Sequence, residues 1–154
     1  MFVIERLTGN VHPVVVEPVV KQDYKRIAKS VYFFDWKTEK KNLTYKLKRK
    51  DSDAILGLIS LMHHQVDQRL EIKLLSVSKE NRGRNKRYKR IAGTLIGFAC
   101  REALKYHGIQ GCVSLEPKTK LKRHYMSQYG MLDGGRQVFL EGVSLLKMLN
   151  TYVP

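Results

Sequence analysis

The 154-residue sequence is poor in acidic side chains, in cysteine and in long apolar runs. It has 14 Asp and Glu against 29 Lys and Arg, which gives a formal net charge of +15. The excess is uneven, because residues 1–77 carry 14 basic and 9 acidic side chains, whereas residues 78–154 carry 15 and 5. Such an imbalance indicates a polyanionic partner without identifying it.

The lack of long apolar runs argues against a membrane protein. The longest stretches, residues 54–62 and 91–100, have about half of the roughly 20 residues that a membrane-spanning helix needs. Residues 1–6 place an acid where a secretory signal has basic residues. The only cysteines, Cys100 and Cys112, are too few for a disulfide framework and have apolar neighbours, so we expect buried free thiols. These features predict a cytoplasmic protein without a membrane partner.

Several catalytic signatures are also missing. The sequence contains neither Gly-x-x-x-x-Gly-Lys-Ser/Thr nor Gly-x-Gly-x-x-Gly. The five His and two Cys have no zinc-site spacing, and His63 and His64 are adjacent on a predicted strand, so their rings point to opposite faces. Cys100 has no activating partner nearby in the sequence, which favours a helix core residue over a nucleophile. We therefore expect no metal.

The first 50 residues predict mainly extended structure. The β-branched run at residues 14–20 predicts a strand, with Pro18 at an edge or a strand end. Residues 23–30 have apolar side chains at helical spacing and predict a short helix, whereas the aromatic cluster at residues 33–36 is not assigned to an element. From residue 42 the period changes to two. This strand is expected to have an apolar face of Leu43, Tyr45 and Leu47 and a solvent face of Thr44, Lys46 and Lys48.

The following residues predict a β-meander. A turn at residues 51–53 precedes an apolar strand at residues 54–64, and a polar connection leads to a third strand at residues 70–78. After a basic loop at residues 79–90, residues 91–106 predict an amphipathic helix.

The helix at residues 91–106 ends near Gly108, and residues 111–115 predict a short apolar strand. A strand, a helix and a strand in this order form a βαβ crossover with two parallel strands. A second helix at residues 118–129, a turn at residues 133–136 and a strand at residues 138–140 follow. The predicted fold class is α/β (α+β), a mixed, mostly antiparallel sheet with a central βαβ unit in a single domain, residues 1–154.

The loop at residues 79–90 is the most informative segment. Seven of its twelve residues are basic, and it leads directly into a helix amino terminus, where free amides and a partial positive charge suit a phosphate. Ligands of such sheets gather at the carboxyl ends of strands. A solvated basic loop without a ligand is the alternative interpretation.

This loop resembles the acyl-CoA-binding loop of the GNAT superfamily of N-acetyltransferases. The family pattern is Arg/Gln-x-x-Gly-x-Gly/Ala at the start of a helix, with a Leu three residues after the last small residue. Arg87 to Ala92 matches it with Leu95 in the right place, but Arg90 stands where Gly is expected. A competing register that starts at Arg82 fits worse.

The next helix extends the resemblance to residues 70–131. In the family this helix bears a Tyr seven residues after a common Asn, followed by a Gly. Here Tyr125 lies seven residues after Lys118, which replaces the Asn, and Gly130 comes one residue later than usual.

The resemblance implies a GNAT-like acyl-CoA N-acyltransferase fold with acetyl-CoA as cosubstrate. Backbone groups at the end of the third meander strand would pair with the pantetheine arm, where the two parallel strands separate. Amides of the loop would hold the pyrophosphate, and its basic side chains would add charge. The implied cofactor-binding residues are Leu75, Ser76, Val77, Lys86, Arg87, Tyr88, Lys89, Arg90, Ile91, Ala92, Gly93 and Lys118.

The implied reaction is direct attack of a deprotonated primary amine on the thioester, so a base must accept the amine's proton. Glu71 is preferred over Glu116, because a carboxylate on this strand is common in the family; a surface Glu71 paired with Lys73 is the alternative. Tyr125 would protonate the departing CoA thiolate, or else serve as a core aromatic of its helix.

The function could also belong to another class. The charge of +15 and the aromatic residues among basic ones, as in residues 45–50, are typical of a non-catalytic RNA-binding or other nucleic-acid-binding module. No helix-turn-helix, zinc-finger or RNP signature accompanies them. The excess charge also indicates an acidic or nucleic-acid-associated amine acceptor, and the family resemblance allows a homodimer.

Overall fold

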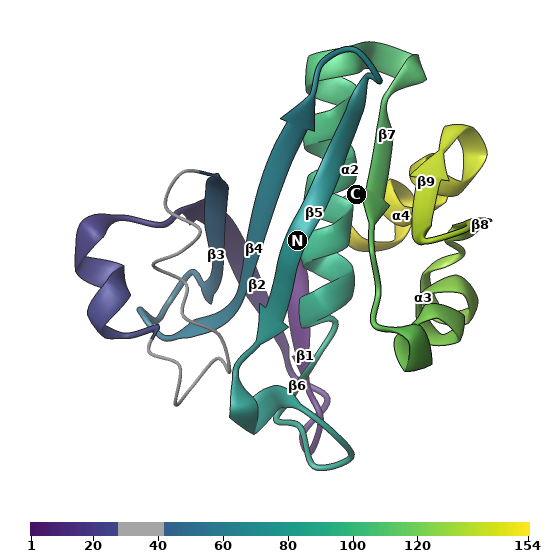
Figure 1. The fold of residues 1–154 in the computed structure, drawn as a ribbon. Coiled ribbons are helices and arrows are strands. Elements are labelled where there is room, and N and C mark those ends of the chain that lie inside the picture. The colour runs from purple at the N-terminus through teal and green to yellow at the C-terminus, as the bar shows by residue number, and fades with distance from the viewer. Residues whose placement is uncertain (28–41) are drawn as a thin grey trace. The chain divides into compact units, whose positions relative to one another are not determined.

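The computed structural model describes residues 1–27 and 42–154 (Figure 1). The aromatic cluster at residues 33–36 and the end of the helix expected at residues 23–30 lie outside the described residues. The described start of that segment is a 3-10 helix, η1 (Lys21–Lys25).

The strands of the described residues follow one hydrogen-bonded order, β6-β1-β2-β3-β4-β5-β7-β9-β8. Strands β5 and β7 are parallel, whereas β1–β2, β1–β6, β2–β3, β7–β9 and β8–β9 are antiparallel pairs. This confirms a mixed, mostly antiparallel sheet with a βαβ unit. The strands are β1 (Phe2–Glu5), β2 (Val11–Pro18), β3 (Leu43–Arg49), β4 (Ile55–His64), β5 (Arg69–Val77), β6 (Tyr88–Lys89), β7 (Cys112–Leu115), β8 (Leu132–Gly134) and β9 (Gln137–Glu141).

Three α-helices occur in the described residues, together with short 3-10 turns. The helices are α2 (Ile91–His107), α3 (Lys122–Tyr129) and α4 (Gly142–Tyr152), and the further 3-10 turns are η3 (Lys79–Asn81), η4 (Gly108–Gln110) and η5 (Thr119–Leu121). None of the described helices is long and apolar enough to cross a membrane.

The chain divides into two compact units. The first unit comprises residues 1–60 and 74–95, and the second comprises residues 61–73 and 96–154. Elements β4, β5 and α2 each contribute residues to both units. The expectation of a single domain stays a prediction.

The first unit is built on antiparallel pairing of β1, β2 and β3, with β6 added beside β1. Pro18 is the last residue of β2, which confirms the strand end expected there. Apolar side chains form the core of this unit. They include Val3, Val14, Val16, Leu47, Leu56, Leu58 and Ile59.

The solvent face expected for β3 is wrong. Thr44 and Lys46 are buried, whereas Leu43 is 41% exposed. The Nζ atom of Lys46 donates a hydrogen bond to Oδ2 of Asp23 at 2.7 Å, so Lys46 forms a buried charge pair where alternation predicts exposure to solvent. Burial raises the pKa of Asp23, but hydrogen bonds from Lys46 and the Val20 amide outweigh it, and the net pKa is lowered.

The second unit confirms the βαβ crossover. Residues Arg69 to Ile72 of β5 pair in parallel with Cys112 to Leu115 of β7, and β9 adds to the other side of β7. Gly130, with φ +68°, ends α3 as expected. The strand predicted at residues 138–140 is confirmed as β9, whereas β8 and α4 were not predicted.

Helix α2 is confirmed, but Tyr106 is 51% exposed although its spacing places it on the apolar face. Cys100 is buried in α2 and Cys112 is half-buried in β7, and both are free thiols. Burial raises the pKa of the Cys100 thiol, and burial followed by the Glu141 charge raises the pKa of Cys112 to about 11. Neither thiol is therefore suited to act as a nucleophile at neutral pH.

Candidate active site

The loop between β5 and α2 is folded around a buried side-chain amide, although most of its other residues are exposed. Asn81 is only 4% exposed. Its Nδ2 donates to Oγ of Ser78 at 2.7 Å, and its Oδ1 accepts from the backbone amide of Tyr88 at 3.0 Å. The side chain thus joins the two ends of the loop, since Ser78 follows β5 and Tyr88 begins β6.

The last part of this loop is anchored to β1. Tyr88 pairs with Glu5 and Lys89 with Ile4, and the Tyr88 ring is 3% exposed. The Tyr88 hydroxyl accepts a hydrogen bond from Nη1 of Arg49 at 2.9 Å. This pairing fixes the approach of the chain to α2.

The anchoring engages two of the loop amides that were expected at the pyrophosphate. The amide of Arg87 donates to the Glu80 carbonyl at 3.3 Å, and the amide of Tyr88 donates to Asn81. Both amides are therefore engaged within the loop and do not remain for a pyrophosphate. The buried Tyr88 ring likewise has a packing role.

Arg90 has the backbone conformation of a glycine. Its φ is +82°, in the left-handed region that side chains with a Cβ rarely adopt. Its carbonyl accepts a hydrogen bond from the Thr94 amide at 2.9 Å, which starts α2, and its guanidinium lies 4.2 Å from the centre of the Phe2 ring. The residue thus keeps the backbone that the family pattern assigns to Gly at this position.

In the first unit, the first turn of α2 offers backbone amides to an anion. Residues Ile91, Ala92 and Gly93 occupy this turn, and the first amides of an α-helix have no intrahelical partner. The Ile91 side chain is buried and Gly93 has none, so only the backbone of these two residues can meet a ligand. Positive charge is supplied nearby in the chain by three bases that form no ion pair within the described residues. These are Arg84, Lys86 and Lys89.

The end of β5 is held by Arg82. The Nε atom of Arg82 donates to the Val77 carbonyl at 3.1 Å, and its Nη2 donates to Oγ of Ser76 at 2.9 Å. Pairing of β5 with β7 ends at Ile72 and Leu115, so β5 continues beyond that pairing to Val77. Leu75 and Ser76 lie in this continuation and keep their expected place, whereas the Val77 carbonyl already has a partner.

Tyr125 lies in the middle of α3 in the second unit and is half-buried. Its ring centre is 5.8 Å from that of His124 and 6.1 Å from that of Tyr129. Burial raises the pKa of Tyr129, and the neighbouring Tyr152 and Tyr125 raise it further. Lys118 is exposed and precedes η5.

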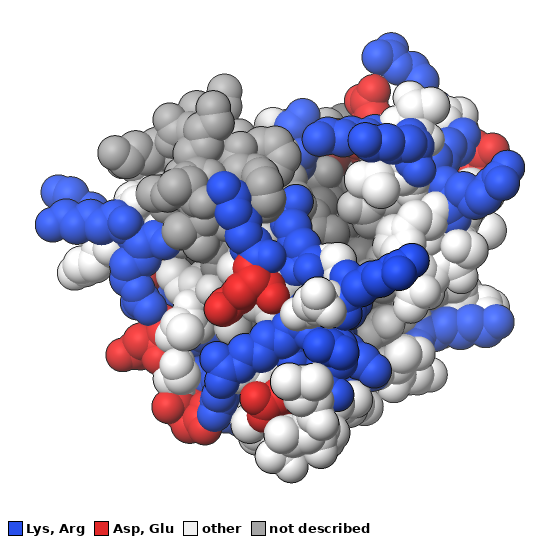
Figure 2. Space-filling model, turned by 90° about the horizontal axis from the view of Figure 1, so that it is seen from below, with Lys and Arg blue, Asp and Glu red and all other residues white. Residues whose placement is uncertain are grey.

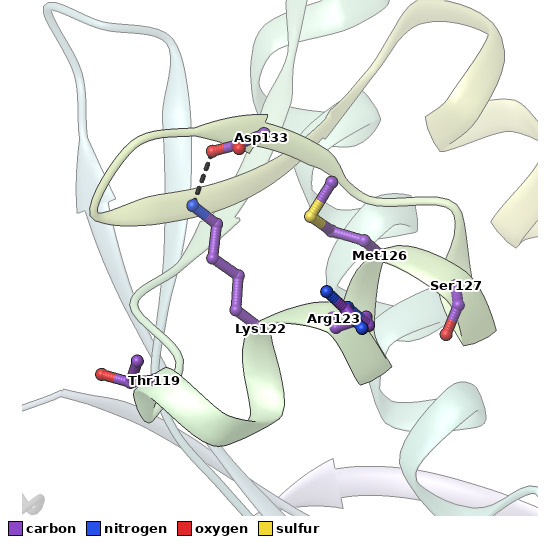
Figure 3. Close-up of a pocket in the computed structure, with 6 residues that line it drawn as sticks. All are labelled: Thr119, Lys122, Arg123, Met126, Ser127 and Asp133. Carbon is purple, nitrogen blue, oxygen red and sulfur yellow. Dashed lines mark ion pairs between the residues drawn. The ribbon is translucent and has the colours of Figure 1, made fainter.

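An open cavity of about 590 Å³ lies beside α3 (Figure 3). Across it, Nζ of Lys122 forms an ion pair with Oδ1 of Asp133 at 2.7 Å, drawn as the dashed line in Figure 3. Tyr125 is not among the residues that line it, which are Thr119, Lys122, Arg123, Met126, Ser127 and Asp133.

Glu71 is not the surface residue of the alternative interpretation. It is 9% exposed, and its nearest partner is Nε2 of His64 at 2.8 Å, while Lys73 is 3.9 Å away. Glu116, the other acid considered as a base, forms an ion pair with Arg136 at 3.5 Å and is about half exposed.

Comparison with solved structures identifies the fold. A spermidine N-acetyltransferase SpeG chimera from Vibrio cholerae and hSSAT superposes with a TM-score of 0.65 at 12% identity, covering 89% of this chain and 98% of that one. An IAA acetyltransferase from Bacillus cereus gives 0.57 at 18% identity, covering 79% of each chain. The chain has the GNAT fold. A Bacillus subtilis acetyltransferase in complex with CoA also matches, with a TM-score of 0.56 at 12% identity, covering 84% of this chain and 98% of that one.

No family model and no curated protein sequence matches the chain. The GNAT fold is therefore evident from structure and from the loop pattern. The coverage also extends the likeness beyond residues 70–131, the segment in which the sequence resembles the family, because the matches include most of the amino-terminal half.

Two polar residues of the GNAT fold escaped prediction. Asn81 was taken as part of a basic loop, although an Asn that follows a strand by a few residues is typical of turns with side-chain hydrogen bonds. For His64, the sequence suggests a contribution to acceptor specificity, as part of residues 63–69, but no catalytic role. Because side chains alternate along a strand, His64 points away from His63. On that face it meets Glu71 of the following strand, β5.

No group of three or more metal-binding side chains occurs in residues 1–27 and 42–154.

Proposed function

We propose that the protein is an acetyl-CoA-dependent N-acetyltransferase that transfers the acetyl group to a primary amine. One observation carries the proposal: in a GNAT fold, Arg90 keeps a positive φ at the start of α2, where the family's acyl-CoA loop has Gly. This backbone turns the chain so that the amides of the first helical turn are free for a pyrophosphate.

We propose fewer cofactor-binding residues than the sequence predicts. The amides of Ile91, Ala92 and Gly93 bind the pyrophosphate, and Arg84, Lys86 and Lys89 add charge. Support comes from the engaged amides of the preceding loop and from the lack of ion pairs for these bases within the described residues. The backbone of Leu75 and Ser76 pairs with the pantetheine arm, since β5 extends past its pairing with β7.

The reaction requires two proton movements. The acceptor ammonium loses a proton, and the neutral amine attacks the thioester carbonyl carbon, so that the N–C bond forms and the C–S bond breaks. Tyr125 gives its hydroxyl proton to the departing CoA thiolate and regains one from the amide nitrogen. Its place on α3 after the second parallel strand supports this role.

The acceptor is a primary amine on a neutral or acidic carrier. The SpeG proteins are spermidine N-acetyltransferases by name, and spermidine is a cation, which a protein of net charge +15 repels. Several carboxylates are engaged by bases: Glu17, Asp51 and Glu71 each pair with Lys or Arg. Figure 2 shows Lys and Arg spread widely over one face, with Asp and Glu at only a few places.

Calorimetry tests the binding of acetyl-CoA, and steady-state kinetics test Tyr125 as the general acid. Acetyl-CoA is expected to bind at sub-millimolar concentration in low salt, and Tyr125→Phe is expected to lower turnover by about 10²-fold with nearly unchanged cofactor affinity. Tyr129→Phe, one helical turn away, is the matched control and should retain most of the activity. No binding by the wild type, or a Tyr125→Phe affinity loss as large as the rate loss, refutes the assigned roles.

A panel of three acceptors identifies the carrier class by release of the CoA thiol. We expect an acidic peptide with a free α-amine to react fastest, glucosamine more slowly and spermidine slowest. Spermidine as the best acceptor contradicts the charge argument but leaves the acetyltransferase proposal intact. A non-catalytic nucleic-acid-binding module rests on the net charge and on the aromatic residues among basic ones, and none of the comparisons supports it.

A further inference from the structure

A buried polar cluster occupies one face of the sheet in the second unit. Nε2 of His64 lies 2.8 Å from Oε1 of Glu71, and Nη1 of Arg69 lies 3.8 Å from the same carboxylate. Arg69 also donates to Oγ of Ser114 at 2.8 Å and to Oε1 of Gln137 at 3.4 Å. The cluster therefore spans β4, β5, β7 and β9 and holds its carboxylate from several sides.

The two side chains of the His64–Glu71 pair differ in solvent exposure. The Glu71 side chain is 11% exposed, whereas that of His64 is 30% exposed. A carboxylate only accepts hydrogen bonds, so Nε2 of His64 must carry the proton in this contact. The Nδ1 atom then keeps its lone pair, and no hydrogen bond to it occurs within the described residues.

The pair lies close to the place where the parallel strands separate. Glu71 is opposite Ser114, and the next pair, Ile72 and Leu115, is the last one between β5 and β7. The GNAT resemblance places the pantetheine arm beyond this point. Glu71, which contacts His64, lies one residue pair before the separation, so we expect the His64 ring to lie close to the thioester.

We propose that His64 is the general base of the acetyl transfer and that Glu71 is its positioning residue. The inference rests on the proposed function and replaces the expectation that Glu71 itself is the base. Nδ1 of His64 takes a proton from the acceptor ammonium, and the resulting amine attacks the thioester as described above. The imidazolium then returns its proton to solvent, so the overall products are the amide, CoA and one proton.

Glu71 is less suited to this step than His64. Its carboxylate is buried and already contacts three groups, His64, Arg69 and Lys73. An imidazole changes protonation near neutral pH, as a general base must. The contact of Glu71 with Nε2 fixes the orientation of the imidazole ring and leaves Nδ1 for the acceptor ammonium.

His63 provides a matched control on the same strand. Its ring points to the other face, 4.5 Å from the Tyr106 ring and 5.3 Å from the His107 ring. Burial, followed by the charge of His107, lowers its pKa. His63→Gln changes a histidine next to His64 without touching the proposed base, so its activity should remain near that of the wild type.

Two measurements test the proposal. Nitrogen NMR of the uniformly labelled protein should show His64 as the Nε2–H tautomer, and Glu71→Gln should reduce that preference. The rate of CoA release, with the best acceptor of the three-member panel, should fall at acidic pH in the wild type. His64→Ala should lower turnover by about 10²-fold or more, with acetyl-CoA affinity retained, and free imidazole should restore part of the rate.

The outcomes separate this inference from the proposed function. An active wild type with His64→Ala within about threefold of it, or with no rescue by imidazole, overturns the base assignment alone. An Nδ1–H tautomer overturns it without any reference to activity. A wild type that releases no CoA with any panel member overturns the acetyltransferase proposal and the inference together.

Discussion

Arg90 makes two opposing contributions to the free energy of folding. The positive φ costs about 1 kcal/mol for a residue with a Cβ, whereas the contact of its guanidinium with the Phe2 ring is favourable. In this chain the anchoring of β6 on β1, immediately before Arg90, keeps the backbone in place.

Substitution of Arg90 separates the two contributions. Arg90→Gly and Arg90→Ala both remove the side chain, so they differ only in backbone freedom at φ +82°. Arg90→Gly should be more stable than Arg90→Ala by about 1 kcal/mol in urea unfolding. Equal stabilities would show that the positive φ is not retained in solution.

At the scale of elements, the start of α2 is positioned by a close approach to β4. A Cβ added to Gly57 would lie 2.7 Å from Cγ2 of Ile91 and 2.9 Å from Cδ1 of Leu95. The backbone of β4 therefore touches the first helical turn directly. The proposed pyrophosphate site depends on this contact, because it fixes where the helix begins.

Gly57→Ala should push the start of α2 away from β4. We expect a loss of about 1–3 kcal/mol in the free energy of unfolding, although Ala alone suits a strand better than Gly. Acetyl-CoA affinity measured by calorimetry should fall as well.

The control is a double-mutant cycle with Leu95→Ala, which removes the clashing Cδ1 atom. The double variant should lose less stability than the sum of the two single variants. Additive losses would contradict a direct clash between β4 and α2.

At the scale of the whole molecule, the net charge of +15 exceeds what one CoA can neutralise. The surplus can act through the general field of the protein or through the bases of the β5–α2 loop. Arg84, Lys86 and Lys89 have no carboxylate partner within the described chain, and the same holds for Arg101, Lys105 and Lys147 on α2 and α4, so the two sets of bases can be compared directly.

Salt distinguishes the two explanations. The affinity for acetyl-CoA should weaken by about tenfold between 50 and 500 mM NaCl. A triple change of Arg84, Lys86 and Lys89 to Gln should weaken binding at low salt and flatten this dependence. The control replaces three exposed bases of α2 and α4, Arg101, Lys105 and Lys147, and removes the same charge. Equal effects of both triple variants would favour the general field.

Much of the fold could be predicted because its signals are local. Apolar runs and helical spacing identify β4, β5, α2, β7 and α3 within a few residues. The missed elements have different causes. Strands β6 and β8 are two and three residues long, too short for a period, and each exists through its partner strand. Strand β3 was found with the wrong face, because Lys46 pairs with a distant Asp23.

The candidate site was predicted in part. The loop pattern identified the helix start and Arg90 as its anomalous residue. The hydrogen bonds of Asn81 and the pairing of β6 with β1 could not be predicted, since they join segments whose contact is decided by the fold. The roles of Tyr125 and Glu71 stay predictions, with His64 now the proposed base.

The sequence by itself determined the class of fold, the parallel crossover and the basic helix start, because periodicity, capping and charge are properties of short segments. Only the tertiary structure decided which amides of the loop remain for a ligand, that Arg90 takes the conformation of Gly, and that Glu71 meets His64. The physical reason is that each depends on pairing between residues apart in the chain, and burial then sets which polar groups must be satisfied.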